Sequence, residues 1–471
     1  SCTKKGADIV VEEVNVEVRS SLLHVLRNRG FSRLWAAQAI SLTAQSMVNF
    51  AVIVLTERVT QRSLFTSLAI LSFVIPPVLV GAFAGVVVDR SNKPAMLWIT
   101  NLLRMLLLVC FFLFDRDWSP SILLIGIFLL TALFAAVSQF FGPAEAATIP
   151  LLVPRNQLLA ANALFATTYN ASLVGGMAIL GPILVAFLGL RRLWLFVAAL
   201  YGLCVILVAR LPSGDRSHEK PLLAVLRDST DGLGATLHRE FWVPVREGWS
   251  FMAGNAPVRT ATINLSVAST ILLVVATLGP GFVSRILGRN PEDVSFLLLP
   301  ASLGMLLGVV LVGRVVRRVG TARLISLSMV GGALSLAGLA LSPFWGSALA
   351  QLLWGINAPA DLLGNTILGG AIVMAVGLGL VNSFITVPAY TQLQEETEDH
   401  MRGRVFASLF MITGSLSMLP VLFAGALADW LGLVAVMVVV ALIMGLAGLA
   451  TLSRRSPAPQ PRGQTDAPPG N

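Results

Sequence analysis

The chain has 471 residues, of which 56% are hydrophobic and only 12% are charged, and its formal net charge is +9. A soluble globular protein carries roughly 25% charged residues, so this composition does not supply the polar surfaces that soluble domains need. The basic residues gather in alternate loops, which explains the positive charge without a nucleic-acid partner. The three cysteines and four histidines show no metal-ligand spacing, so no metal or cofactor is expected.

Apolar runs of about 20 residues, each able to cross a bilayer core of roughly 30 Å, recur along the whole chain. They predict an all-α polytopic membrane protein with twelve transmembrane helices. An even number of spans puts both termini on one side, and about 25 of the 33 basic residues fall there, which predicts cytoplasmic termini. The predicted spans are residues 33–57, 64–88, 95–114, 120–141, 158–188, 192–211, 259–287, 292–316, 321–342, 366–388, 403–429 and 432–453.

A polar linker divides the spans six and six. Its arginines, leucines and tryptophans are typical either of amphipathic helices on the membrane surface or of a flexible basic connector, and we favour the helices. An amphipathic helix is also expected within Val16–Phe31, before the first span. The predicted domains are a cytoplasmic N-terminal segment at 1–32, six-helix bundles at 33–211 and 259–453, the linker at 212–258 and a disordered tail at 454–471.

Two short patterns occur in both halves and indicate an internal repeat. Gly81 and Gly85, near the end of the second span, recur as Gly304 and Gly308 near the end of the eighth. Pro143-Ala144 and Pro388-Ala389 likewise end the fourth and tenth spans. The separation of these two Pro-Ala pairs along the sequence exceeds that of the two glycine pairs by about the length of Pro343–Asn365. We therefore predict two parallel six-helix repeats, with 343–365 as an external insertion that forms a re-entrant or interfacial helix.

The loop from Gly81 to Lys93 joins a small-residue helix face to a charge cluster. Gly81 and Gly85 lie on one face of a helix, so another backbone can approach closely there. Asp89, Arg90 and Lys93 follow where the apolar run stops. The pattern fits a conformational latch between two moving halves, but also an ordinary charged helix end.

With twelve spans, a six-plus-six division and this loop, the chain resembles transporters of the major facilitator superfamily. The loop resembles the family pattern of glycine, aspartate, arginine and following basic residues, although Pro94 interrupts the usual basic run. FGPAEAATIPLLVPRNQLLAANAL (Phe141–Leu164) and QEETEDHMRGRVFAS (Gln394–Ser408) resemble the bacterial drug and siderophore exporter branch, which includes macrolide efflux and enterobactin export proteins.

The resemblance implies that Asp89 stabilises a closed cytoplasmic side by pairing with a neighbouring helix. Arg104 is a partner or neighbour for it, because an arginine inside a span costs at least about 2.5 kcal/mol and normally faces a bundle interior. The alternative for Arg104 is snorkelling toward the cytoplasmic headgroups. The second copy of the loop carries no acid where Asp89 would fall. Its latch residues are Gly304, Gly308, Arg314, Arg317 and Arg318.

Polar residues within the spans are candidates for the substrate path. Gln38, Gln45 and Asn49 lie within about 20° of one line on the first span. Such a stripe lines a cavity or binds helices together, and since first spans line the central cavity in the family it resembles, we favour the cavity. For the remaining candidates, taken singly, interhelical hydrogen bonding is the stronger reading. They are Asn162, Tyr169, Asn264, Asn382 and Thr386.

Acidic residues inside the spans are scarce, and none is clearly at mid-membrane. Glu57 ends the first span, Glu145 follows the fourth and Asp429 ends the eleventh. Because proton-coupled transport needs a carboxylate that alternates between pathways, Glu57 and Glu145 are the coupling candidates. The competing interpretation of each is a charged helix end.

These features predict a secondary active transporter in a bacterial plasma (inner) membrane. We expect a proton-driven exporter, an antiporter of an amphipathic drug-like or siderophore-like molecule, that works by alternating access. No phosphate-binding loop or convergent catalytic group is present in the sequence, so neither an ATP-driven pump nor an enzyme is expected. The alternatives are a lipid or lysophospholipid transporter and a transport-inactive scaffold that docks a membrane-complex partner through 343–365.

Overall fold

The computed structural model describes residues 25–113, 119–211, 243–354, 359–397 and 401–453, and every regular element among them is a helix. Most of the amphipathic segment Val16–Phe31, most of the linker and the whole tail lie outside the described residues. Within the linker, residues 243–254 form a helix, which is one of the two interpretations that the sequence left open.

The first half runs from α2 to α8. Its fourth crossing consists of two consecutive helices, α5 and α6, and its fifth crossing bends through a π-helical segment, η2. Gly189 has a φ of 73°, which separates the fifth crossing from the sixth within the long helix α8. The elements are α2 (Arg29–Thr60), α3 (Ser63–Asp89), α4 (Lys93–Leu113), α5 (Pro120–Ser138), α6 (Phe141–Leu152), η1 (Arg155–Gln157), α7 (Leu158–Val174), η2 (Gly175–Leu180) and α8 (Gly181–Ala209).

The second half runs from α11 to α18 and has a second π-helical segment, η5, directly after Gly279, Pro280 and Gly281. Such segments interrupt the regular helix and are frequent at functional positions. The elements are α11 (Val243–Gly254), α12 (Ala256–Gly281), η5 (Phe282–Ile286), η6 (Pro291–Val294), α13 (Ser295–Val319), α14 (Thr321–Ala340), α15 (Ser342–Trp354), α16 (Ala360–Glu395), α17 (Arg402–Leu431) and α18 (Leu433–Ser453).

Eleven helical segments among the described residues are long and apolar enough to cross a membrane. One of them, Leu158–Ala209, has 52 residues and contains two crossings that turn at Gly189. The described chain therefore has the twelve crossings that the apolar runs predict. Large apolar side chains such as Phe187, Leu352 and Leu446 lie exposed on the outside of the helices, as expected for a surface in contact with lipid.

The segment 343–365 is helical for most of its described length. Helix α15 covers its first part, and the indole of Trp345 donates a hydrogen bond of 2.7 Å to the carbonyl oxygen of Gly338 on α14. Residues 360–365 belong to α16, so the tenth crossing starts earlier than the predicted 366. The polar residues Asp361 and Asn365 led the sequence analysis to end the insertion too late.

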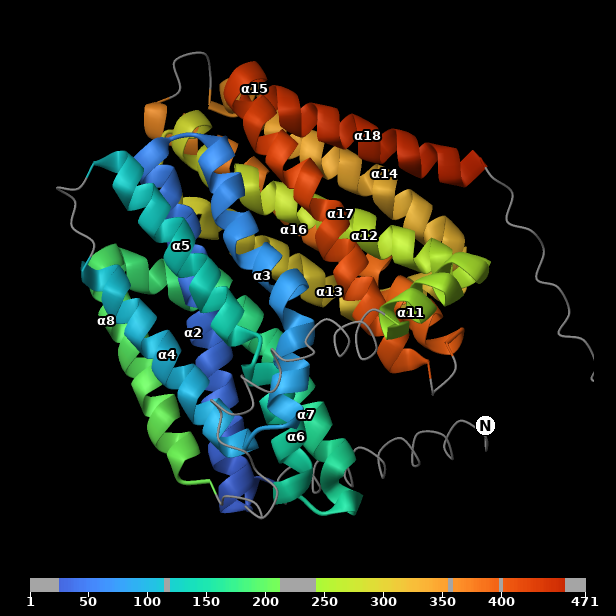
Figure 1. The fold of residues 1–471 in the computed structure, drawn as a ribbon. Coiled ribbons are helices and arrows are strands. Elements are labelled where there is room, and N and C mark those ends of the chain that lie inside the picture. The colour runs from blue at the N-terminus through green and yellow to red at the C-terminus, as the bar shows by residue number, and fades with distance from the viewer. Residues whose placement is uncertain (1–24, 114–118, 212–242, 355–358, 398–400, 454–471) are drawn as a thin grey trace, which may run out of the picture.

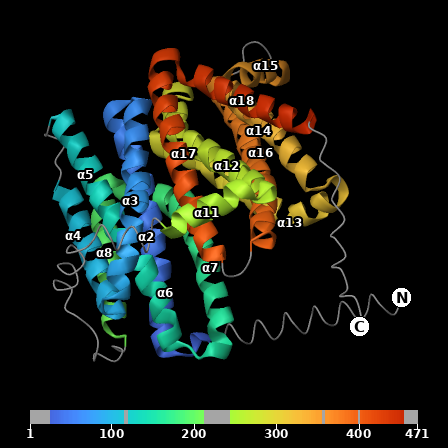
Figure 2. The ribbon, with the colours of Figure 1, turned by 45° about the vertical axis from the view of Figure 1, so that its right-hand side comes forward.

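Figure 1 shows the two halves side by side, with α2 to α8 in blue to green and α11 to α18 in yellow to red. Helix α3 of the first half lies beside α17 of the second in both views (Figures 1 and 2). The main apolar core extends across both halves, and its largest buried side chains include Phe50, Phe134 and Tyr201 from the first half and Phe282 from the second. Apolar packing therefore joins the halves, and polar contacts between them do so as well.

Candidate functional site: an inter-half gate and a buried arginine

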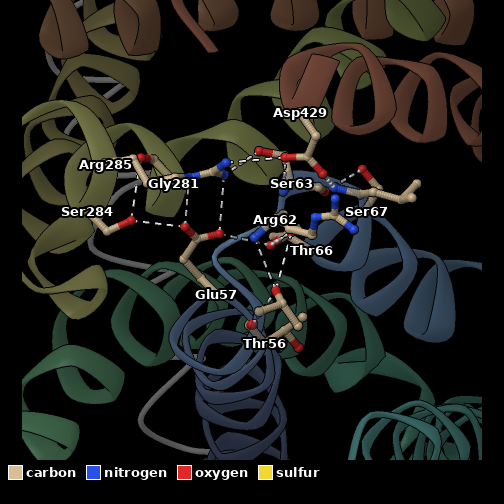
Figure 3. A network of polar contacts seen from close by, with 12 residues as sticks. Thr56, Glu57, Arg62, Ser63, Thr66, Ser67, Gly281, Ser284, Arg285 and Asp429 are labelled. Atoms are coloured by element: carbon tan, nitrogen blue, oxygen red, sulfur yellow. Dashed lines mark hydrogen bonds and ion pairs between the residues drawn. The ribbon is translucent and has the colours of Figure 1, made fainter. Parts of the chain in front are cut away.

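Polar side chains join the two halves where α2 ends and α3 begins, and we call this place the closed end. The opposite end of α3, where α4 begins, is called the α3–α4 end. Figure 3 shows the polar residues of the closed end converging from both halves. We name the following set the gate: Glu57, Ser63 and Thr66 from the first half, and Ser284, Arg285 and Asp429 from the second.

Arg285, on η5, lies at the centre of the gate. Its Nε is 3.1 Å from Oε1 of Glu57, which is fully buried, and its Nη1 is 3.2 Å from Oδ1 of Asp429. The hydroxyls of Ser284 and Thr66 donate to the two oxygens of Glu57 at 2.9 and 3.3 Å. A carboxylate removed from water in this way depends on its cation and on its hydrogen bonds. The first half thus supplies a buried anion that the second half neutralises.

Asp429 of α17 caps the start of α3 across the interface. Backbone N–H groups of Ser63 and Leu64 donate to Asp429 Oδ1 and Oδ2 at 2.7 and 2.9 Å. The first N–H groups of a helix have no partner inside it, and a carboxylate there also complements the helix dipole. The residue at α3's own N-cap position, Arg62, makes no capping bond with its side chain. The N-terminus of a helix in one half is therefore capped by a side chain of the other half.

Close packing between α3 and α17 supports these polar contacts. A Cβ added at Gly425 on α17 would lie 2.6 Å from the carbonyl oxygen of Ser63, so a larger residue does not fit there. The Ser67 hydroxyl donates to the carbonyl oxygen of Val421 at 2.9 Å. Further along the two helices, a Cβ at Gly414 would be 3.3 Å from the side chain of Val78. The helices are thus in contact from the start of α3 to about its middle.

An additional ion pair joins Arg58, at the end of α2, to Glu292 on η6. The Nε of Arg58 donates to Oε2 of Glu292 at 3.2 Å, and Nη2 donates to the other oxygen. The Arg58 side chain is 33% exposed, so water screens this pair more than it screens the gate.

In the predicted latch at the α3–α4 end, the glycine face has no close contact with the second half among the described residues. A Cβ at Gly81 would be 4.0 Å from the nearest atom outside its own helix, the side-chain oxygen of Gln139, and a Cβ at Gly85 would have no atom within 4 Å. Asp89 is exposed, and Lys93 donates to its backbone carbonyl oxygen at 2.9 Å rather than to its carboxylate. The structure does not bring Asp89 together with Arg104.

The second copy of the glycine pair is packed closely. A Cβ at Gly304 would overlap the carbonyl group of Val376, and a Cβ at Gly308 would be 2.8 Å from the carbonyl oxygen of Leu380. Both neighbours belong to α16 of the same half. The predicted second-half latch residues Arg314, Arg317 and Arg318 are exposed beyond this contact.

Arg104 of α4 is fully buried inside the first half, so the interior interpretation holds and snorkelling does not. Its Nη1 donates to the Ser41 hydroxyl at 2.9 Å, and its Nε reaches the carbonyl oxygen of Thr100 at 3.4 Å. The guanidinium carbon lies 4.7 Å from the ring centre of Phe141 and 5.1 Å from that of Tyr201. The cation is thus held by two aromatic faces together with the Ser41 hydroxyl and the Thr100 carbonyl oxygen.

The predicted cavity residues differ in their surroundings. Gln38 on α2 and Asn264 on α12 are buried, and the Gln38 side-chain oxygen has no hydrogen-bond partner among the described residues. Gln45 and Asn49 are partly buried, as are Asn382 and Thr386, of which Thr386 donates to the Asn382 carbonyl oxygen at 2.9 Å. Asn162 and Tyr169 on α7 are exposed. The assignment of all these residues to a substrate path stays a prediction.

Arg285 was not among the predicted site residues, and Asp429 was predicted only as a helix end. The available signal was the distribution of charge at this end of the spans. The first half carries Glu57 and the second carries Arg285 and Asp429, at the ends of spans that meet on the same side of the bilayer. The pairing itself joins residues that are 228 and 144 positions apart, and no local pattern encodes it.

An all-helical polytopic protein, with two six-helix halves that are joined by a gate at one end, has the architecture of a membrane transporter. A family model described as "Major Facilitator Superfamily" matches residues 34–363. The chain belongs to the major facilitator superfamily, and it is accordingly a transporter and not an enzyme.

Three proteins illustrate what this chain is similar to, together with one further solved structure. The transporter YfiS of Bacillus subtilis is 24% identical over 425 residues, which cover 90% of this chain and 93% of YfiS. Macrolide efflux protein A of Streptococcus pyogenes is 26% identical over 279 residues, or 53% of this chain and 66% of that protein. Among solved structures, the nucleoside transporter NupG superposes with a TM-score of 0.64 at 13% identity and covers 90% of this chain and 99% of its own. A bacterial homologue of the iron transporter ferroportin superposes with a TM-score of 0.59 at 16% identity. The superposition covers 90% of this chain and 99% of the homologue. These structural likenesses concern the fold.

Proposed function

We propose that this chain is a secondary active exporter of an amphipathic small molecule, that it works by alternating access and that a proton gradient drives it. The gate supports alternating access, because it fastens the two halves at one end through contacts that a rocking motion can break. At the other end of the same helix, α3, Gly81 and Gly85 have no close neighbour in the other half. A transporter closed at one end and apart at the other presents one side of the membrane at a time.

The side assignment follows from charge. The loops at the α3–α4 end lie on the side that carries most of the basic residues, and the positive-inside rule makes that side cytoplasmic. The closed end then faces outward, both termini lie inside, and the protein belongs in the plasma (inner) membrane of a bacterium. The resemblance of this chain to a macrolide efflux protein supports export and an amphipathic cargo.

Everted membrane vesicles test this function directly. We expect radiolabelled erythromycin or the lipophilic dye ethidium to accumulate when a proton gradient is imposed, and to stop accumulating when a protonophore collapses it. Asp89→Asn should slow accumulation, because it removes the one acid of the predicted latch, whereas Glu395→Gln, at an exposed position on α16, should not. Uptake that ignores the gradient would overturn proton coupling and leave a facilitator. Uptake of a labelled lysophospholipid alone would indicate a lipid transporter.

A reversible cross-link tests alternating access separately from the cargo. Cysteines at positions 58 and 292, whose native side chains form an ion pair between the halves, should be joined by a short bis-methanethiosulfonate cross-linker that locks the closed end. Transport should then stop and return after reduction, while either single cysteine variant should continue to transport after the same treatment. Undiminished transport in the cross-linked protein would contradict the proposed motion, whereas a wild-type protein that transports no probe at all would favour a scaffold.

A further inference from the structure

The buried Arg104 is not part of the gate, and its surroundings leave polar atoms unpaired. The Nη2 group of Arg104 has no hydrogen-bond partner among the described residues, although the side chain is fully buried. A buried cation in a membrane protein normally faces a carboxylate or a watery path. Here the nearest compensation comes from the rings of Phe141 and Tyr201 and from the hydroxyl of Ser41.

A carboxylate is close to this cation but does not pair with it. Glu145 follows Phe141 by four residues on α6, so both side chains lie on the same face of that helix, one turn apart. Glu145 is only 8% exposed, and its Oε1 has no hydrogen-bond partner among the described residues. The charge of Arg104 acts on it electrostatically, yet the two side chains form no ion pair. The polar atoms left unpaired on Arg104 and Glu145 are complementary.

The other elements packed against α6 bring no further charge to Glu145. Helix α5 contains no titratable residue, and Arg104 is the charged residue that acts on Glu145 among the described neighbours. The remaining titratable or charged residues on the helices that pack against α6 are Arg29, Arg33, Glu57 and Arg58 on α2, Asp89 on α3, Lys93 and Cys110 on α4, and Tyr169 on α7.

We infer that Glu145 is a proton-binding site, and that its proton decides whether Arg104 rests on Phe141 or forms an ion pair with Glu145. This inference rests on the proton-driven transport proposed above and names the group that carries the proton. With the proton bound, Glu145 is neutral and Arg104 stays over the ring, as seen here. When the proton leaves to water, the carboxylate and the guanidinium are both charged in a buried site, and they attract each other strongly.

The movement required is small and has a defined direction. Phe141 and Glu145 are separated by one turn of α6, about 6 Å along its axis, so Arg104 can change partner by a change of rotamer with a shift of α6 against α4. Two alternative positions of one helix against another are a common basis of conformational switching. Because α6 continues the fourth crossing toward the α3–α4 end, this switch can link proton release to the position of the loop that carries Asp89.

Infrared difference spectroscopy of the purified protein in lipid nanodiscs tests the site without any cargo. Lowering the pH should produce the carbonyl band of a buried protonated carboxylic acid in the wild-type protein. The band should be absent in Glu145→Gln and unchanged in the matched control Glu395→Gln. In Arg104→Gln the band should no longer respond over the wild-type pH range, because the carboxyl group has lost its cation. A wild-type band that survives in Glu145→Gln would overturn the inference.

Transport in proteoliposomes separates failure of this inference from failure of the proposed function. With ethidium as the probe, Glu145→Gln should lose accumulation driven by a proton gradient but keep exchange of labelled for unlabelled ethidium. Gradient-driven accumulation that persists in Glu145→Gln would overturn the proton site and leave the exporter proposal intact. A wild-type protein without any gradient response would overturn proton coupling, and the infrared band would then decide whether Glu145 binds a proton at all.

A third pair of variants covers the case in which Glu145→Gln does not fold. Phe141→Leu removes one of the two aromatic rings that contact Arg104 but keeps both charged groups, so it should shift the pH range of the infrared band. The double variant Arg104→Gln/Glu145→Gln removes both charges together and should express better than Arg104→Gln alone. An infrared band that ignores Phe141→Leu would contradict the exchange of partners.

Discussion

The two ends of α3 show what a gate requires. At its start, α3 is capped by Asp429, lies against Gly425 and carries Ser63 in contact with Arg285, so it is fastened to the second half. At its other end, Gly85 has open space, a Cβ at Gly81 would meet only the side chain of Gln139 from the same half, and Asp89 is exposed. One helix thus has a formed contact with the second half at its start and none at the glycine pair near its other end.

The repeated glycine pairs make the same point between the halves. Gly304 and Gly308 let α13 approach α16 inside the second half, and this contact is complete in the structure. Gly81 and Gly85 occupy the corresponding place in the first half, but no helix backbone comes within 4 Å of a Cβ at either position. The same pattern of small residues therefore serves a permanent packing contact in one repeat and is left for a transient contact in the other.

Arg285→Leu should have the largest effect, because it leaves the fully buried Glu57 without its cation. Breaking a buried ion pair by removing one partner costs about 3–5 kcal/mol. This cost destabilises the conformation in which the gate contacts are formed. We expect the closed end to open, with longer distances between spin labels at positions 59 and 293 and a loss of transport. The double variant Glu57→Gln/Arg285→Leu should recover part of the closed population. Unchanged distances in Arg285→Leu would show that packing alone holds the gate.

Alanine substitutions in the two glycine pairs should distinguish a contact that is always formed from one that forms only during transport. Gly304→Ala should lower the free energy of unfolding by about 1–3 kcal/mol, because the added methyl group overlaps the backbone of α16. Gly85→Ala should leave thermal stability nearly unchanged but slow transport, since its methyl group meets another helix only when the α3–α4 end closes. Thermal melts in detergent and transport rates measure the two effects. Equal losses of stability in both variants would abolish the distinction.

The crossings were predictable from the sequence, because length and hydrophobicity alone decide whether a segment spans a bilayer. The turn at Gly189 falls where the predicted fifth span ends, and only a glycine readily adopts that backbone conformation. The gate was not predictable, since Glu57, Arg285 and Asp429 come from three distant crossings and each looks like an ordinary charged helix end. The burial of Arg104 was anticipated from its cost in a span, but its aromatic partners depend on how α6 and α8 pack.

Asp429→Ala should have a smaller effect than Arg285→Leu, because Asp429 is less buried than Glu57 and Arg285 keeps its other carboxylate. Loss of a helix cap costs about 0.5–2 kcal/mol. The loss should appear as faster hydrogen exchange of the amides of Ser63 and Leu64, measured by mass spectrometry of the peptide that contains them. Asp429→Asn, which keeps an oxygen acceptor, should protect these amides better than Asp429→Ala does. Equal exchange in all three proteins would mean that Asp429 does not cap α3.

Arg58→Ala should have the smallest effect, although its ion pair with Glu292 also joins the halves. The Arg58 side chain is 33% exposed, and ion pairs at exposed positions contribute about 0–1 kcal/mol, which salt reduces further. We expect transport to fall slightly at low ionic strength and to match the wild type at high ionic strength, whereas Arg285→Leu should remain impaired in both. The salt series therefore ranks the two inter-half arginines by burial. A large, salt-insensitive loss in Arg58→Ala would show that the gate extends over η6 as a single unit, and that burial alone does not set the strength of its ion pairs.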